Sequence, residues 1–442
     1  MKVLKVMLCA AMLAGPAAAA TRAPLNVVLI SLNALRADHL AAYGYGKETA
    51  PNISRLASEG ALFEHAAAQS HWTLSSLASL FTSKYVHSHG VYGRGQKLAP
   101  GETTLAAVLK EAGYRTAAFT GGLDMSGLYG LSKGFEVYFD DTGKKPMGSF
   151  KEIMPRALDW LAARRGEKFF LFLDSYDIHP PFDKPWPGGK EPGYSGSLKG
   201  KSLSYDFLRG FKDGTLRLTG EDLAYINSRY DAGITYSDGF VGGLLAKLDE
   251  LGLSSSTVVI LTSEHGEELG ERGSFDRFGQ GNLYEEAVRV PLVIRDPRTP
   301  GGARIAAQAQ LIDLMPTVLD ILGLKVPSGA QGASLLPLLS GAAGKDFNRY
   351  VYAEAGPGKW MIRSGGWKLI CDSGKYSLFD LVNDKAEKRD LAAAKPDMVY
   401  SLAQKLVKWR RATRTGRSPD GARVELSPEM KRKLREAGYW RE

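Results

Sequence analysis

The chain has 442 residues, of which 44% are hydrophobic and 24% charged, as in an ordinary soluble globular protein. This length predicts a large core domain with a smaller module, and the sequence shows neither an internal repeat nor a low-complexity block. The net charge of +9 does not indicate nucleic-acid binding, because it is concentrated at the ends of the chain. Residues 405–442 contain twelve Lys or Arg and five Asp or Glu and so carry +7, which predicts either a solvated helical end or a tail that rests on an anionic polymer.

The first residues have the pattern of a secretory signal peptide. A basic start, an apolar run from Val6 to Leu13 and the small residues Ala18 and Ala20 define residues 1–20 as this peptide. We expect no integral membrane segment after cleavage, because this run is too short to cross a bilayer and no later stretch is long enough. The mature chain would keep one cysteine, Cys371, and no internal disulfide, which favours a periplasmic or secreted protein.

From residue 25 to residue 323, apolar runs alternate with helical patterns. Buried strands are predicted at residues 25–32, 115–120, 169–174, 257–263 and 290–295. Helices are predicted at residues 51–60, 73–82, 103–113, 150–163, 223–251 and 313–323, and residues 188–215 form an insertion or lid. This alternation predicts an α/β domain over residues 21–343, built on a large, mostly parallel central sheet flanked by helices.

After residue 344 the pattern changes to short strands separated by Gly, Ser and Lys. The strands are predicted at residues 350–354, 360–363, 367–371 and 376–379, followed by a helix near 398–411. Residues 344–442 therefore read as a small α+β module with an antiparallel sheet and a basic helical tail.

Thr73 stands where a loop gives way to a helix. Leu74, Leu77, Leu80 and Phe81 fall on one face of that helix. Free backbone N–H groups and the positive end of the helix dipole favour an anion at such a position. A hydroxyl there could attack a phosphate or sulfate ester, although threonine is also a common helix N-cap.

Six segments in order resemble landmarks of the sulfatase family, in the alkaline-phosphatase superfamily. They lie at residues 26–40, 49–63, 72–82, 262–270, 283–292 and 313–317, and residues 434–439 resemble the end of many members. The resemblance covers most of the mature chain. It implies an alkaline-phosphatase-like fold and an ester hydrolase or transferase whose nucleophile is bonded to a divalent metal.

Carried over by position, the resemblance makes Thr73 the nucleophile and assigns Asn33, Thr73, Glu264 and His265 as metal ligands. The family has Asp where Asn33 and Glu264 stand, so we expect one ion of Ca, Mn, Mg or Zn, bound weakly. Taken alone, Glu264 and His265 could also be a strand-end cap. Threonine cannot mature to formylglycine as sulfatase nucleophiles do, which implies phosphate-ester chemistry at least as readily as sulfate-ester chemistry.

Four further residues are candidates for contact with the substrate. His179 matches a family histidine that implies a general acid or substrate contact, or it is a loop histidine in solvent. Arg272 and Gln280 fall near positions where many relatives have histidine, and Arg272 could bind an anionic oxygen with two hydrogen bonds. His89 follows the Thr73 helix and is either structural or part of the substrate site.

Together these features predict an exported sulfatase-like hydrolase or transferase. Its substrate would be a phosphate or sulfate ester of an anionic small molecule, a glycan or a lipid headgroup. The alternative is a catalytically degenerate protein of the same fold that binds an anionic glycan or envelope polymer, since several expected metal ligands are replaced.

Overall fold

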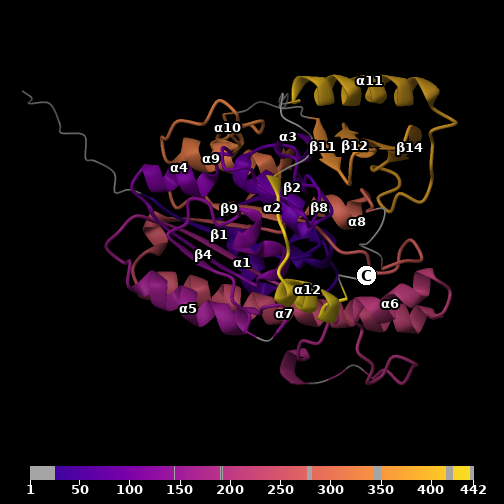
Figure 1. Cartoon of the computed structure of the whole chain (residues 1–442), viewed down its shortest axis with the longest axis horizontal. Coiled ribbons are helices and arrows are strands. Elements are labelled where there is room, and N and C mark those ends of the chain that lie inside the picture. The colour runs from indigo at the N-terminus through magenta and orange to yellow at the C-terminus, as the bar shows by residue number, and fades with distance from the viewer. Residues whose placement is uncertain are drawn as a thin grey trace, which may run out of the picture.

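A mixed sheet lies between two layers of helices, and a smaller antiparallel sheet packs beside it (Figure 1). The structure is a computed structural model that describes residues 25–143, 145–189, 191, 193–275, 281–342, 350–414 and 422–438. The architecture confirms the predicted fold class. The predicted signal peptide and the predicted boundary between residues 343 and 344 lie outside the described residues.

The large sheet has the strand order β10-β2-β9-β7-β1-β6-β4-β5, and β8 pairs with β2. Its strands are β1 (Asn26–Leu32), β2 (Ala61–Ala67), β4 (Arg115–Thr120), β5 (Val137–Phe139), β6 (Phe169–Ser175), β7 (Thr257–Thr262), β8 (Arg289–Val290), β9 (Leu292–Arg295) and β10 (Ala303–Gln310). β1 is parallel to β6 and β7, whereas β9 runs antiparallel to β7 and β2. The carboxyl ends of β1, β6 and β7 therefore meet at one edge, where open α/β sheets bind ligands.

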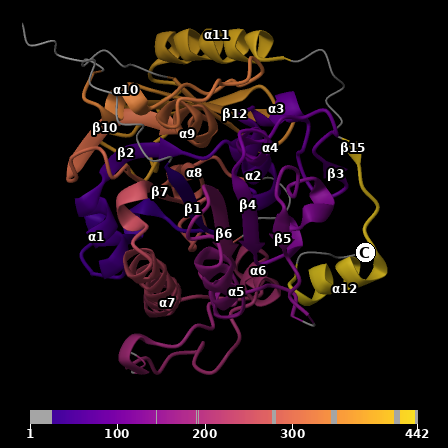
Figure 2. The same ribbon diagram turned by 90° about the vertical axis from the view of Figure 1, so that its left-hand side faces the viewer.

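Helices cover both faces of this sheet (Figure 2). One face packs against α1 (Pro51–Glu59), α5 (Phe150–Ala162) and α7 (Gly220–Glu250). The other packs against α2 (Thr73–Thr82), α4 (Leu105–Glu111) and α9 (Leu314–Ile321). The remaining helices are α3 (Val86–His89), α6 (Tyr205–Lys212), α8 (Glu285–Val288), α10 (Leu336–Leu339), α11 (Pro396–Ala412) and α12 (Pro428–Glu436). Within the described residues, none of these helices combines the length and apolar character needed to cross a membrane.

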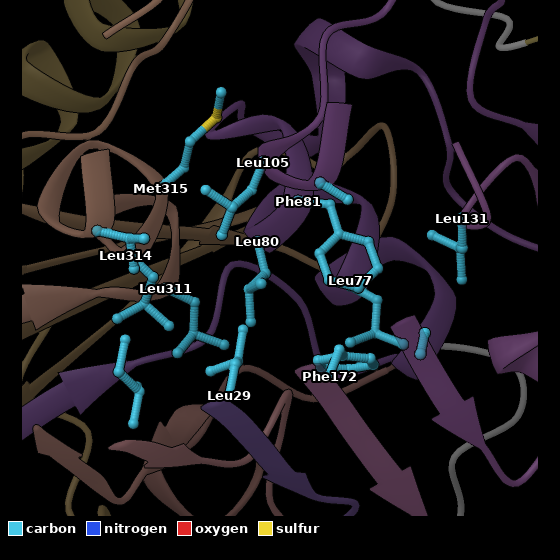
Figure 3. Close-up of a cluster of buried hydrophobic side chains, with 14 of the residues drawn as sticks. Leu29, Leu77, Leu80, Phe81, Leu105, Leu131, Phe172, Leu311, Leu314 and Met315 are labelled. Carbon is cyan, nitrogen blue, oxygen red and sulfur yellow. The ribbon is translucent and has the colours of Figure 1, made fainter. Parts of the chain in front are cut away.

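The apolar face of α2 fixes this helix in the core. Leu77, Leu80 and Phe81 lie in one buried cluster with Leu29 of β1 and Phe172 of β6 (Figure 3). The rings of Phe81 and Phe172 meet edge-on with their centroids 4.9 Å apart. The predicted apolar face of α2 packs directly on the sheet. The other side of the helix is covered as well, since every residue of α2 is buried.

The C-terminal module is an antiparallel sheet under one long helix. Its strands are β11 (Val351–Glu354), β12 (Lys359–Ser364), β13 (Trp367–Asp372) and β14 (Lys375–Asp380), which match the predicted meander. Residues 422–438 return to the large domain (Figure 2). There β15 (Ala422–Arg423) pairs with β3 (Gln96–Lys97), and Leu434 of α12 is buried in the core around α2. The basic tail is thus partly integrated into the large domain.

A buried ion cluster joins the small sheet to α8. Lys368 of β13 is fully buried, and its Nζ lies 3.0 Å from Glu285 Oε1 and 2.9 Å from Glu387 Oε1. Arg363 of β12 pairs with the other oxygen of Glu285 at 3.0 Å. Glu285 is the first residue of α8, so this cluster also anchors the chain where the long connection from β7 enters α8.

We predict that Lys368→Ala will lower the free energy of unfolding by about 3–5 kcal/mol, because two buried carboxylates lose their shared cation. The measurement is thermal or urea unfolding followed by circular dichroism. Lys359→Ala is the matched control, since Lys359 lies in the same sheet but pairs with the exposed Asp372. Its removal is expected to cost less than about 1 kcal/mol. Equal losses in the two variants would contradict the prediction.

Candidate active site

The candidate site forms where β1, β7 and the first turn of α2 meet. Asn33 follows β1, and Glu264 and His265 follow β7. Asn33 Nδ2 donates to Thr73 Oγ1 at 3.2 Å, and Thr73 Oγ1 lies 3.0 Å from His265 Nε2. The structure therefore brings the predicted nucleophile together with two of its three predicted partners. Trp72, not Thr73, is the N-cap of α2, so the Thr73 hydroxyl is available for this contact.

The partners of His265 fix the direction of the hydrogen bond from Thr73. His265 Nδ1 lies 2.7 Å from the carbonyl oxygen of Gly266, which can only accept, so Nδ1 carries the proton. Nε2 of the neutral ring is then an acceptor. Thr73 receives a hydrogen bond from Asn33 and donates its own proton to His265, an arrangement suited to removing that proton.

The loop carrying Glu264 and His265 is held closely against its surroundings. The amide of Gly266 donates to the carbonyl of Ala287 at 2.8 Å, and a side chain at position 266 would collide with the backbone oxygen of Glu286. Ser263 Oγ donates to the carbonyl of His265 at 2.6 Å. Glycine at position 266 is therefore required by close backbone approach, and it lets His265 sit beside Thr73.

The loop after β1 is held in an uncommon conformation. Ala34 has a φ of 68°, in the left-handed region that residues other than glycine rarely adopt. The hydroxyl of Tyr230 on α7 donates to the Ala34 carbonyl at 2.6 Å and accepts from the Arg36 amide at 2.8 Å. Arg36 itself forms ion pairs with Asp38 and Glu271. These contacts fix the turn that presents Asn33.

Two buried carboxyl groups face this part of the sheet edge. Glu264 accepts a hydrogen bond of 2.7 Å from Ser31 of β1, and its other oxygen lies 3.5 Å from His265 Nε2. Asp174 on β6 is fully buried, and among the described residues its carboxylate has no basic partner, although the Ser31 hydroxyl and the amides of Ser175 and Asn33 lie beside it. Burial and the nearby Glu264 carboxylate raise the pKa of Asp174 well above its usual range. Sequence reasoning identified Asp174 only as the end of a strand.

Oxygen donors at the site suit a hard divalent cation. Asn33 Oδ1 is buried without a hydrogen-bond partner among the described residues, and carboxylate, amide and hydroxyl oxygens are the ligands that Mg²⁺, Ca²⁺ and Mn²⁺ prefer. In the described ranges, no three His, Cys, Asp or Glu side chains form a cluster of metal-ligand type. A cation here would therefore depend on Asn33 and Thr73, and the ligand set remains a prediction.

His179 lies in the loop after β6, beside the insertion that carries α6. Its Nε2 lies 3.2 Å from the hydroxyl of Tyr205, and that hydroxyl donates to Glu267 Oε2 at 3.0 Å. The rings of His179 and Tyr205 meet edge-on with centroids 5.1 Å apart. The predicted insertion thus contributes Tyr205 to the surroundings of the candidate general acid, which the sequence did not reveal.

Two of the three other substrate-contact candidates, Arg272 and His89, do not join the Thr73 group. Arg272 bonds to Glu286 at 3.0 Å and to the carbonyls of Ala386 and Glu387, both at 2.9 Å. His89 is buried and bonds to Ser79 Oγ at 2.9 Å and to the Val91 amide at 3.1 Å, and burial lowers its pKa to about 3. Gln280 lies outside the described residues. The partners of Arg272 link the loop after β7 to the C-terminal module.

Comparison with known proteins identifies the family. The sequence model of the sulfatase family matches residues 25–324, and that of the N-sulphoglucosamine sulphohydrolase C-terminal region matches residues 270–412. The chain belongs to the sulfatase family. Members of this family generally use a divalent metal ion.

Curated relatives include sulfatases and a broader member of the superfamily. Arylsulfatase K from Mus musculus is 26% identical over 412 residues, which covers 80% of this chain and 74% of that protein. The multifunctional alkaline phosphatase superfamily protein PehA from Trinickia caryophylli is 29% identical over 305 residues, 58% of each chain.

Solved structures share the fold. A phosphonate monoester hydrolase of Agrobacterium radiobacter has a TM-score of 0.70 and 22% identity, covering 88% of this chain and 96% of its own. The structure of BT4656 in complex with its substrate D-glucosamine-2-N,6-O-disulfate has the same TM-score and identity, covering 88% and 98%. At this level of identity the likeness concerns the fold alone.

The loop after His265 gives a pH prediction. Glu268 is 8% exposed, and burial together with the carboxylates of Glu286, Glu271 and Glu267 raises its pKa from 4.5 to about 8. The folded chain then holds a proton that the unfolded chain releases above pH 4.5, so this group lowers stability as pH rises towards 8. The loss is at most about 1.4 kcal/mol per pH unit.

We predict that Glu268→Gln will reduce the loss of stability between pH 5 and pH 8. The melting temperature of the variant should be close to that of the parent at pH 5 and higher than that of the parent at pH 8. Thermal unfolding across this range is the measurement. The exposed Glu111→Gln should follow the parent at every pH. A Glu268→Gln curve parallel to the parent curve would show that Glu268 does not hold this proton.

Proposed function

We propose that this protein is a hydrolase or transferase that cleaves a phosphate or sulfate ester through Thr73. The observation that carries the proposal is the pair of hydrogen bonds at the Thr73 hydroxyl, which accepts from Asn33 and donates to His265. A hydroxyl becomes an effective nucleophile when a neighbouring base takes its proton during attack. His265 Nε2 has the geometry and the protonation state for that task.

The proposed reaction has two steps. Thr73 Oγ1 attacks the phosphorus or sulfur atom, its proton passes to His265 Nε2, and the ester oxygen leaves with a proton supplied by His179. Glu264, 3.5 Å from the same nitrogen, stabilises the imidazolium that forms. Water or an acceptor hydroxyl then displaces Thr73, giving its proton to His179, and Thr73 takes its own proton back from His265. A bound divalent cation would stabilise the negative charge on the ester oxygens.

The substrate class follows from the nucleophile and from the relatives. Thr73 cannot become formylglycine, so the covalent ester that it forms must be cleared by attack at phosphorus or sulfur. We therefore propose phosphate or phosphonate esters as the first candidate substrates and sulfate esters as the second. The solved structures with this fold include both a phosphonate monoester hydrolase and BT4656 with a sulfated glucosamine, so both ester classes are tested, with an anionic glycan or other small anionic molecule as the carrier.

The test is release of p-nitrophenol from p-nitrophenyl phosphate, bis-p-nitrophenyl phosphate, p-nitrophenyl phenylphosphonate and p-nitrophenyl sulfate, with Mg²⁺, Ca²⁺, Mn²⁺ or Zn²⁺ added. We predict that Thr73→Ala will lower kcat for the hydrolysed ester by at least about 1000-fold, because the attacking atom is removed. Thr73→Ser should retain measurable activity, and His265→Gln should lose about 100-fold.

Thr82→Ala is the matched control, because Thr82 lies at the other end of α2 and bonds only within that helix. It should hydrolyse the esters at the parent rate. Turnover that is unchanged in Thr73→Ala would refute the proposal. The absence of turnover with every ester, combined with tight binding of a sulfated glycan, would instead favour a catalytically degenerate binding protein.

We also propose that the chain is exported, because residues 1–20 have the pattern of a signal peptide. The predicted result is a mature protein that begins at Thr21 and is recovered from the periplasm or medium of a bacterial host. N-terminal sequencing of the recovered protein is the measurement. Recovery of the unprocessed chain from the cytoplasm would contradict export.

A further inference from the structure

Asp174 is a buried carboxylate for which the fold provides no counter-charge. It is fully buried, and no basic side chain pairs with it among the described residues; only the Ser31 hydroxyl and the amides of Ser175 and Asn33 lie close enough to favour the ionised form. An ionised carboxylate in such a place costs several kcal/mol unless a cation or hydrogen bonds compensate it. Asp177, three residues further, accepts from the Phe150 amide at 2.7 Å and pairs with Lys184 at 3.2 Å. Asp177 thus has a basic partner, whereas Asp174 has none among the described residues.

Strand register places Asp174 with the oxygen donors beside Thr73. Ser31 of β1 is the register partner of Asp174 on β6 and of Thr262 on β7. Register partners in parallel strands point to the same face, as do residues two apart along a strand. Asp174 and Ser31 therefore share one face at the carboxyl edge; Ser31 bonds to Glu264 at 2.7 Å, and the Asn33 amide, in the turn directly after β1, lies beside the Asp174 carboxylate.

We propose that Asp174 is a ligand of the divalent cation of this site, with Glu264, Asn33 Oδ1 and Thr73 completing the set. With Asp174 and Glu264, two carboxylates then face the cation. This arrangement balances the charge of a divalent ion, which Glu264 alone would not. The proposal rests on the proposed function only in placing the cation next to Thr73.

The donor atoms of this set agree with the rest of the geometry. His265 Nε2 is occupied by the Thr73 hydroxyl, so the cation is held by oxygen alone. Only two of the proposed ligands, Asp174 and Glu264, are His, Cys, Asp or Glu. This agrees with the absence, among the described residues, of any group of three such side chains that could hold a metal ion. Oxygen ligation favours Mg²⁺, Ca²⁺ or Mn²⁺ over Zn²⁺.

The experiment measures cation binding to the full mature chain without any substrate. Protein treated with a chelator is titrated with CaCl₂, MnCl₂, MgCl₂ or ZnCl₂ by isothermal titration calorimetry, and the cation-induced rise in melting temperature is recorded. We expect one Ca²⁺ or Mn²⁺ per chain. Asp174→Asn should weaken binding by at least about 30-fold and abolish the rise, since a charged ligand becomes neutral. Asp177→Asn should bind within about threefold of the parent.

The double variant Asn33→Asp with Asp174→Asn provides the stringent test. It returns the acidic group to β1 and is expected to recover binding to within about threefold of the parent. Affinity that is unchanged in Asp174→Asn overturns the proposal, as does a double variant that binds no better than Asp174→Asn. A parent chain that binds none of the four cations also overturns it.

These outcomes are separate from those that test the nucleophile. Loss of binding in Asp174→Asn, combined with ester hydrolysis that does not depend on Thr73, would retain the ligand and reject the proposed function. Hydrolysis that depends on Thr73, combined with cation affinity that does not depend on Asp174, would retain the proposed function and reject Asp174 as a ligand.

Discussion

The arrangement of the site depends on one buried chain of hydrogen bonds, from Asn33 to Thr73 and from Thr73 to His265. Its members come from the end of β1, the start of α2 and the end of β7. No local sequence preference joins these points, so the packing of α2 on the sheet must do so. The buried contacts of Leu80 and Phe81 with β1 and β6 therefore help to hold the candidate site together, since a shifted helix would break both bonds at Thr73.

The charge around this chain of bonds is unbalanced on one side. Arg36, Arg272 and Lys368 all bind carboxylates, but these pairs hold loops and join the small sheet to α8. By contrast, Asp174 and Glu264 are buried close together, and the Glu264 carboxylate raises the pKa of Asp174. Lys and Arg thus stabilise the loops and the small sheet, whereas two carboxyl groups lie together beside Thr73, an arrangement that a bound cation would favour.

Sequence reasoning recovered those parts of the fold in which pattern and burial agree. β1, β6, β7 and α2 were predicted because each is a continuous apolar run or an apolar helical face. β2 was missed because Glu64 and His65 interrupt its apolar run. The meeting of Asn33, Thr73 and His265 followed from the family landmarks. The partners of Arg272 could not be predicted, since they lie up to 115 residues away in the sequence.

The replacement of Asp by Asn at position 33 is better explained by the threonine than by decay of the site. An aspartate here could only accept, so it would compete with His265 for the single proton of the Thr73 hydroxyl. Asparagine donates from Nδ2 to Thr73, which directs that proton to His265, and it keeps Oδ1 free for a cation. The charge lost at position 33 is available again from Asp174. Asn33, Thr73 and Asp174 therefore form a consistent set in the proposed site: Asn33 directs the Thr73 proton to His265, and Asp174 supplies the carboxylate that Asn33 lacks.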